Sequence, residues 1–250
     1  MSGKGPPASG ASRRIEGGIV DRPAFSASER DFLSSAAGRL GVRISEAAID
    51  DLERYVRELE TWSLRLNLVA FRDRQDLLER HVVDSLAAAG PLADLGPAIS
   101  VADLGSGAGF PGVPLAICLD LGRMVLVEPR RRRASFLRSA ARLLPERRIE
   151  VAGYRAEELD LQEWSGFDAI VTRATFQIPD LLSTAEPLLR PGGLLIAFRG
   201  PAFEGEGAPS TSTAPGTDDS RWTRLEDLSY TLSGRAFRLA RWRACPGPAI

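Results

Sequence analysis

Apolar residues recur at three- and four-residue spacing through the first third of the chain. The clearest run predicts an amphipathic helix with one buried face, and its members are Ile49, Leu52, Tyr55, Val56, Leu59 and Trp62. Ser28 and Ser45 are candidate N-caps. Shorter helices are expected at Arg74–Arg80 and Asp84–Ala89, so residues 28–95 are predicted to form a small helical subdomain. Residues 1–27, rich in Gly, Pro, Ser and Ala without periodicity, are predicted to be a disordered tail.

The pattern changes at Ile99, where short apolar runs begin to alternate with helical segments. Strands are expected at 99–104, 124–127, 149–151, 167–172 and 194–198, and helices at 114–119, 131–144 and 178–189. Pro191-Gly192-Gly193 is expected to be a tight turn, 201–220 a flexible low-complexity loop, and 222–232 with 236–242 a closing antiparallel pair. Alternating strands and helices form a parallel sheet with right-handed crossovers. Residues 96–250 are therefore predicted to be one Rossmann-like α/β domain with a mostly parallel seven-stranded sheet flanked by helices.

The residue counts exclude several chemistries. His81 is the only histidine, Cys118 and Cys245 are the only cysteines, and the one lysine, Lys4, lies in the tail. A disulfide framework, a metal site and a Schiff-base lysine are therefore not expected. No run is long and apolar enough to cross a membrane and no signal peptide is evident, which predicts a cytoplasmic protein. The formal net charge is −1, so RNA contact would require a local basic patch.

A glycine-rich segment, VADLGSGAGFPGVP at Val101–Pro114, follows one predicted strand and precedes a helix. Glycines such as Gly105 and Gly107 let the backbone turn sharply and approach a ligand closely, and the helix start offers free N–H groups to an anion. Glu128 ends the next strand, 23 residues after Gly105, where it can accept hydrogen bonds from ribose hydroxyls. This pattern indicates a nucleotide-like cofactor.

Two cofactors fit the glycines, because Gly107–Gly112 also matches the dinucleotide pattern G-x-G-x-x-G. The strand ends two residues before that fingerprint, and Asp103 stands where it suits the ammonium group of S-adenosylmethionine. The LLRPGGLLIAF segment is a frequent companion of that cofactor. These details favour S-adenosylmethionine. An NAD-dependent oxidoreductase is the alternative, although only Tyr154 offers a candidate for hydride-transfer chemistry.

Five segments together resemble the bacterial 16S ribosomal RNA guanine-N7 methyltransferases, known as RsmG or GidB. They are WSLRLNLVAFRD (62–73), RHVVDSL (80–86), VADLGSGAGFPGVPLA (101–116), FDAIVTRA (167–174) and LLRPGGLLIAFRG (188–200). The resemblance covers residues 45–200. It implies a class I methyltransferase fold, S-adenosylmethionine as cofactor, and 16S ribosomal RNA or the small ribosomal subunit as partner of a monomeric enzyme.

The candidate site residues come from the loop pattern, from positions near strand ends and from the resemblance, which implies cofactor or active-site positions for Gly105, Phe110, Glu128, Ala156, Glu157 and Arg173. The cofactor would be held by Asp103, Gly105, Gly107, Phe110, Glu128, Ala156, Glu157 and Arg173. Arg173, Arg155 and His81 are the catalytic candidates, and Arg199, Arg80, Asp84 and Ser85 are the candidates for RNA contact. The chain departs from the family at Val69, at Arg199 in place of lysine, and at the arginine-rich stretch after Glu128.

Several alternatives remain open at this level. His81 and Asp84 could touch the target nucleotide, or they could anchor the N-terminal helices to the sheet. The eight arginines between residues 130 and 148 could bind RNA phosphates or form a solvated helix face. A non-catalytic ribosome-binding protein and a methyltransferase for another substrate share the same glycine loop. The N7 of guanine carries a free lone pair, so methyl transfer to it needs no general base, and the sequence predicts an enzyme that works by positioning its reactants.

Overall fold

The computed structural model describes residues 22–173, 176–200 and 221–245, so most of the predicted tail and the whole predicted loop at 201–220 lie outside the described residues. The N-terminal unit begins with α1 (Ala27–Arg39) and α2 (Glu46–Ser63). Ser45 caps α2 as predicted, but Ser26 rather than Ser28 caps α1. Phe25 is already buried, so the folded chain begins a few residues earlier than predicted.

The two short helices expected between residues 74 and 89 are one continuous helical segment. It runs through α3 (Arg74–Leu77), a π-helical turn (η1, Leu78–Val83), a 3-10 turn (η2, Leu86–Ala88) and α4 (Ala89–Ala93). π-Helical turns are rare and occur often at functional sites. This π-helical turn contains His81. The turn determines the directions in which the side chains of the RHVVDSL segment point.

The sheet has seven strands in the order β3-β2-β1-β4-β5-β7-β6. Their bounds are β1 (Ser100–Leu104), β2 (Arg123–Val127), β3 (Ile149–Ala152), β4 (Phe167–Thr172), β5 (Leu189–Arg199), β6 (Trp222–Leu232) and β7 (Arg235–Ala244). The first five are parallel, and β7 pairs antiparallel with both β5 and β6. This confirms the predicted sheet. The observed strand order differs from the order 3-2-1-4-5-6 of dinucleotide-binding sheets, because the antiparallel strand β7 lies between β5 and β6.

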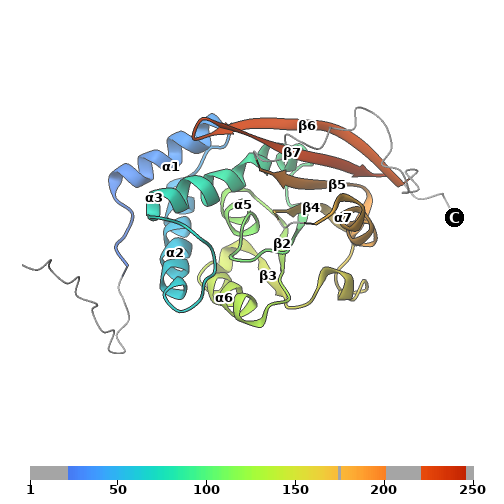
Figure 1. Cartoon of the computed structure of the whole chain (residues 1–250), viewed down its shortest axis with the longest axis horizontal. Helices are drawn as coiled ribbons and strands as arrows, with labels where there is room; N and C mark the ends of the chain where they lie inside the picture. The colour runs from blue at the N-terminus through green and yellow to red at the C-terminus, as the bar shows by residue number, and fades with distance from the viewer. Residues whose placement is uncertain (1–21, 174–175, 201–220, 246–250) are drawn as a thin grey trace, which may run out of the picture.

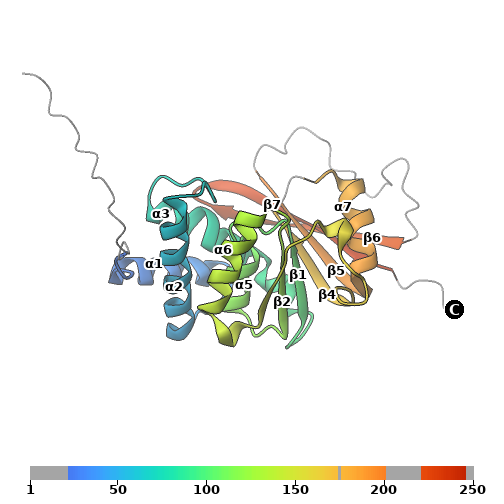
Figure 2. The same cartoon turned by 90° about the horizontal axis from the view of Figure 1, so that it is seen from below.

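Helices cover both faces of the sheet. α2, α5 (Gly112–Cys118) and α6 (Arg131–Arg142) lie on one face and α7 (Ile178–Ala185) on the other (Figures 1 and 2). Successive strand residues alternate between the faces: on β2, Leu126 joins the core under the first group of helices and Val127 joins the core under α7. The N-terminal unit thus extends one layer of the α/β domain.

Two details near the C-terminal part of the sheet differ from the prediction. Helix α7 ends at Ala185 and continues as a 3-10 turn, η5 (Glu186–Leu188). Pro191-Gly192-Gly193 is not a separate turn: it lies within β5, where Gly192 has φ +79° and the register against β4 shifts. Within the described residues, no helix is long and apolar enough to span a membrane.

Candidate cofactor and substrate site

The glycine loop joins β1 to α5 and depends on glycine at three positions. Gly105, Gly107 and Gly109 have φ values of +75°, +60° and +96°, which side chains of L-residues rarely tolerate. A Cβ on Gly109 would lie 2.9 Å from the Tyr55 hydroxyl and 2.7 Å from a Val113 methyl. A Cβ on Gly107 would meet nothing closer than 3.8 Å. The underside of the loop is therefore tightly packed, while its surface at Gly107 is open to a ligand.

Tyr55 supports the loop from below. It is fully buried on α2, and its hydroxyl donates a 2.6 Å hydrogen bond to the Ala108 carbonyl. Its ring meets Phe110 edge-on at a centroid distance of 5.6 Å. Burial raises the pKa of Tyr55, so the hydroxyl keeps its proton and remains a donor. The sequence places Tyr55 in an apolar stripe, and nothing local reveals this role.

Glu128 directly follows β2 and holds the same loop from the side. One carboxylate oxygen accepts from the Gly107 N–H at 3.0 Å and the other from the Arg130 N–H at 2.8 Å. Ala156 and Glu157 lie in η4 (Ala156–Glu158), after the neighbouring strand β3. The predicted cofactor residues thus gather at the carboxyl ends of three adjacent parallel strands, where open α/β sheets bind ligands.

Asp103 is buried beneath the loop. One of its oxygens accepts from the Gly112 N–H at 3.0 Å, at the start of α5, and the other has no hydrogen-bond partner in the described structure. Burial raises the pKa of Asp103 to about 7, although the Gly112 bond opposes the shift. The carboxyl group therefore fixes the first turn of α5. The other oxygen is buried without a hydrogen-bond partner, and the contact of Asp103 with an ammonium group stays a prediction.

A second cluster forms around Arg173, which follows β4. Its guanidinium donates to Asp84 Oδ2 at 2.9 Å and lies 3.2 Å from His81 Nδ1. It also stands over the Phe110 ring, 5.2 Å from the centroid. Tyr230, from β6, donates to the other Asp84 oxygen at 2.6 Å. Asp84 therefore joins the N-terminal unit, β4 and the C-terminal hairpin, and the contribution of Tyr230 could not be inferred from the sequence.

The hydrogen bonds fix the protonation state of His81. Its Nε2 lies 3.2 Å from the Ala70 carbonyl, which can only accept, so Nε2 carries the proton. Its Nδ1 then accepts from Arg173. Burial, followed by the positive charge of Arg173, lowers the pKa of His81. The ring is therefore neutral and engaged on both nitrogens, which suits a role in positioning Arg173.

The other predicted residues are more scattered. Asp84 is buried, and so is Ser85, whose hydroxyl donates to the His81 carbonyl at 2.5 Å. This geometry favours anchoring over RNA contact for both. Arg80 is exposed and lies 3.6 Å from Asp76. Arg199, at the end of β5, has a pKa lowered by burial. Arg155 is exposed beyond the edge strand β3, three strand positions from β4, so the structure does not bring it to Arg173.

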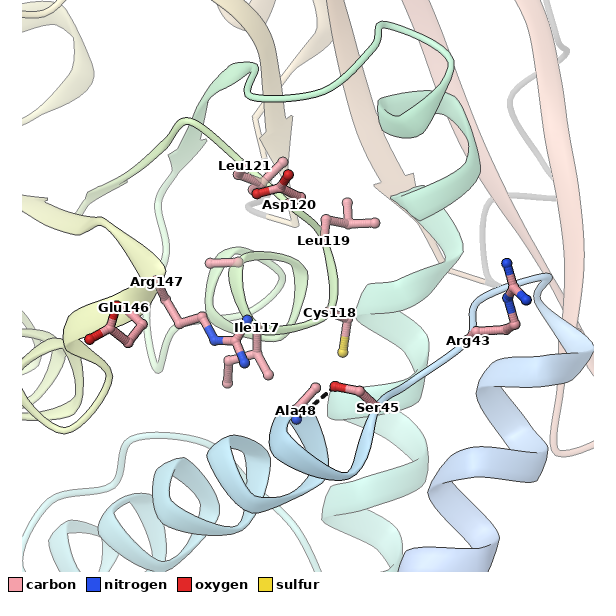
Figure 3. A pocket seen from close by; sticks show the side chains of 11 residues that line it. Arg43, Ser45, Ala48, Ile117, Cys118, Leu119, Asp120, Leu121, Glu146 and Arg147 are labelled. Carbon is pink, nitrogen blue, oxygen red and sulfur yellow. Dashed lines mark hydrogen bonds between the residues drawn. The ribbon is translucent and has the colours of Figure 1, made fainter.

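A separate cavity of about 210 Å³ lies at the opposite end of the sheet. It is lined by the end of α5, the segment before β2, the start of α2 and Arg147 (Figure 3). Burial raises the pKa of Cys118, which points into this region, to about 12, so the thiol stays protonated. This cavity adjoins the amino ends of the strands and is no part of the cofactor site. Among the described residues, no group of His, Cys, Asp and Glu could hold a metal ion.

Comparison with known proteins identifies the family of this chain. The family model described as rRNA small subunit methyltransferase G (GidB) matches residues 48–214. The chain belongs to this family. Among curated ribosomal RNA small subunit methyltransferases G, the Geobacter sp. (strain M21) protein is 32% identical over 83% of this chain and 93% of its own length. The Stenotrophomonas maltophilia (strain K279a) protein is 38% identical over 69% of this chain and 81% of its own.

Solved structures show the same fold. An O-methyltransferase from Bacillus cereus, in complex with SAH, aligns with a TM-score of 0.53 and 22% identity over 77% of this chain and 90% of its own. A putative O-methyltransferase from Klebsiella pneumoniae aligns with a TM-score of 0.51 and 16% identity over 88% of this chain and 97% of its own. The GidB family chain therefore has a Rossmann-like methyltransferase fold, and the NAD-dependent alternative is not favoured.

Proposed function

We propose that this GidB family protein transfers the methyl group of S-adenosylmethionine to N7 of a guanine in 16S ribosomal RNA. The observation that carries the proposal is the juxtaposition of two clusters. The glycine loop held by Glu128 fits the cofactor, and Phe110, at the end of that loop, contacts Arg173 and His81 directly. A nucleotide acceptor and a methyl donor would meet at this point.

Methyl transfer to guanine N7 requires the protein mainly to position the donor and the acceptor. S-adenosylmethionine supplies a methyl carbon that is electrophilic because it is bonded to a positively charged sulfur. Guanine N7 carries an in-plane lone pair and no proton, so no base has to act. The neutral, doubly engaged His81 agrees with this requirement. The protein contributes proximity and orientation, which account for a large part of the barrier reduction in such reactions.

The roles follow from the contacts. Glu128 fits the ribose hydroxyls of the donor. The start of α5 leaves no free N–H group for the donor's carboxylate, because Gly112 donates to Asp103 and Val113 to the Gly109 carbonyl, and prolines have no N–H. The Arg173 guanidinium is a planar donor, and guanine O6 and N7 accept hydrogen bonds on one edge. Arg173 would therefore orient the base through O6 while N7 faces the methyl group. Asp84 and Tyr230 hold the guanidinium in place from behind.

The decisive experiment uses the purified full chain, tritiated S-adenosylmethionine and small ribosomal subunits from cells that lack this methyltransferase. We expect label in 16S RNA, at one guanine whose glycosidic bond becomes labile, as N7-methylguanosine does on mild reduction and aniline treatment. Parallel reactions with naked 16S RNA and with large-subunit RNA define the substrate. Absence of label in every RNA, or label at a position other than N7, would contradict the proposal.

The proposal also includes the oligomeric state of the enzyme and the cellular location of the reaction. We expect a monomer to be sufficient, since the cofactor and acceptor residues named above come from one chain. With ribosomal RNA as the substrate, we expect the reaction to take place in the cytoplasm. Sedimentation during turnover checks the first expectation.

A further inference from the structure

Four consecutive arginines, Arg130–Arg133, follow Glu128 and begin α6; we refer to them as the arginine cluster. Together with Leu66, Asn67 and Leu68, from the segment between α2 and α3, they line a cavity of about 310 Å³. The cavity adjoins the cofactor site. The backbone N–H of Arg130 binds Glu128, and the Arg133 guanidinium lies 3.8 Å from the position of a Cβ on Gly107.

The charges of the arginine cluster are uncompensated. Arg130, Arg131 and Arg132 are exposed, and no ion pair joins any of the four to an acidic group in the described part of the chain. Two other arginines are paired, Arg123 with Glu150 and Arg147 with Asp51. The unpaired charges of the cluster lie where a nucleotide-like ligand is expected.

The position of the cluster is also unfavourable for the fold. α6 has no acidic residue in its first turn and no side-chain cap, so four positive charges gather at the end of the helix that is already positive. A helix selected for stability alone would carry acidic residues there. Departures of this kind from local rules are typical of functional sites. Anions bound at the cluster would remove the conflict.

The geometry indicates a chain of anions and not a single one. All four arginines line one cavity, and their four positive charges are more than a single phosphate would neutralise. They present charge across a broad surface, which suits a polymer with a phosphate at every residue. The net charge of −1 provides little general attraction for RNA. A local surface beside the cofactor must provide it.

We propose that the arginine cluster and residues 66–68 bind the phosphodiester backbone of the substrate RNA next to the target guanine; this rests on the function proposed above. The surface determines the affinity for RNA and leaves the affinity for the cofactor unchanged. The arginines accordingly favour association with RNA at the expense of the stability of α6.

The test is the double variant R131Q/R132Q, which leaves Arg133 beside the glycine loop in place. We expect its affinity for in vitro transcribed 16S RNA to fall about tenfold, and the slope of log affinity against log salt to decrease in magnitude by about 1.4, since each phosphate contact contributes about 0.7. The kcat and the KM for S-adenosylmethionine should not change. The matched control is R142Q, at the far end of the same helix, which should bind RNA like the wild type.

Measurements of unfolding stability distinguish RNA binding by the arginine cluster from a purely structural role of these arginines. Removing positive charge from the start of α6 should raise the unfolding midpoint of R131Q/R132Q in urea, while R142Q should lower it slightly. A raised midpoint with unchanged RNA affinity and salt slope would overturn the proposal. Equal loss of RNA affinity in R142Q would also overturn it, because the effect would then be general charge.

Two further measurements distinguish RNA from a single bound anion and separate RNA binding from methyl transfer. Inorganic phosphate, added at constant ionic strength, should not displace RNA; displacement at low millimolar phosphate would show a single-anion site and contradict the polymer surface. RNA binding is measured by fluorescence anisotropy, independently of methyl transfer. If the wild type binds RNA in a cluster-dependent way but never methylates it, the proposed function fails and the docking surface stands.

Discussion

Replacing Glu128 by glutamine tests the cofactor site most sharply, because the change is isosteric and removes one charge. The carboxylate accepts two backbone N–H groups, from Gly107 and Arg130, and the side chain is only 3% exposed. Glutamine has one acceptor oxygen and must turn its NH₂ group toward one of these donors. A hydrogen bond to a charged group is worth about 1.5–3 kcal/mol. We expect roughly 2–3 kcal/mol to be lost from the bound arrangement of the loop.

That loss converts into a measurable change in affinity. Since about 1.4 kcal/mol corresponds to a factor of ten, E128Q should bind S-adenosylhomocysteine roughly 30- to 150-fold more weakly in calorimetry. 5′-Methylthioadenosine, which keeps the ribose but lacks the amino-acid portion, separates the two roles of Glu128. If the carboxylate binds the ribose, both ligands lose affinity. If it only holds the loop, the loss is confined to S-adenosylhomocysteine.

The matched control is E150Q, which removes a carboxylate from the neighbouring strand β3, where Glu150 pairs with Arg123 at the surface. Its ligand affinities should equal those of the wild type. Wild-type affinity of E128Q for both ligands would refute the reasoning, because neither the loop nor the ribose would then depend on the carboxylate. A loss shared equally by E150Q would show a general effect of charge.

Two further predictions concern buried charges. Because the pKa of Asp103 is raised from 3.8 to about 7, the folded state binds more protons than the unfolded state between these values, and stability falls as the pH rises through that window. From pH 5 to pH 8 the wild type should lose roughly 2–3 kcal/mol relative to D103N in urea unfolding; parallel profiles would contradict the assignment. R173A leaves the Asp84 carboxylate without its cation and should cost roughly 2–3 kcal/mol of stability, less than a fully buried pair because Arg173 is 21% exposed. Adding D84N should recover stability but not single-turnover methyl transfer, and a wild-type rate in R173A would exclude the orienting role.

Much of the fold follows from local signals. The first five strands are short apolar runs bounded by glycine, proline or charged residues, and the glycine loop is set by φ values that only glycine adopts easily. The start of α1 could also be predicted from the sequence. Ser26 precedes Glu29 by three residues and forms a capping box with it, whereas the residue three positions after Ser28 is Asp31. The prediction of Ser28 missed that distinction.

The rest depends on contacts that no local pattern encodes. Tyr55 reaches a carbonyl 53 residues away, and Tyr230 reaches Asp84 across 146 residues. Both look like ordinary amphipathic positions until the chain is folded. The π-helical turn at Leu78–Val83 leaves no periodic trace, because six residues are too few to define a phase. Pro191-Gly192-Gly193 has turn composition, but it forms the irregularity between the pairs of Leu189 and Leu194 with β4, and β5 continues beyond it.

The structure shows contacts of the RHVVDSL segment that the sequence alone does not reveal. Its His81 and Asp84 both bind Arg173, and Asp84 is held in turn by Tyr230, which lies beyond the 48–214 region shared with the family model. The segment that most specifically marks the resemblance therefore acts through another residue, by setting the position of a guanidinium beside the glycine loop. Because the last member of this chain of contacts comes from the C-terminal hairpin, we expect that hairpin to be needed for the proposed acceptor side of the site. A change at Tyr230 should consequently affect Arg173 and the acceptor while leaving cofactor affinity intact.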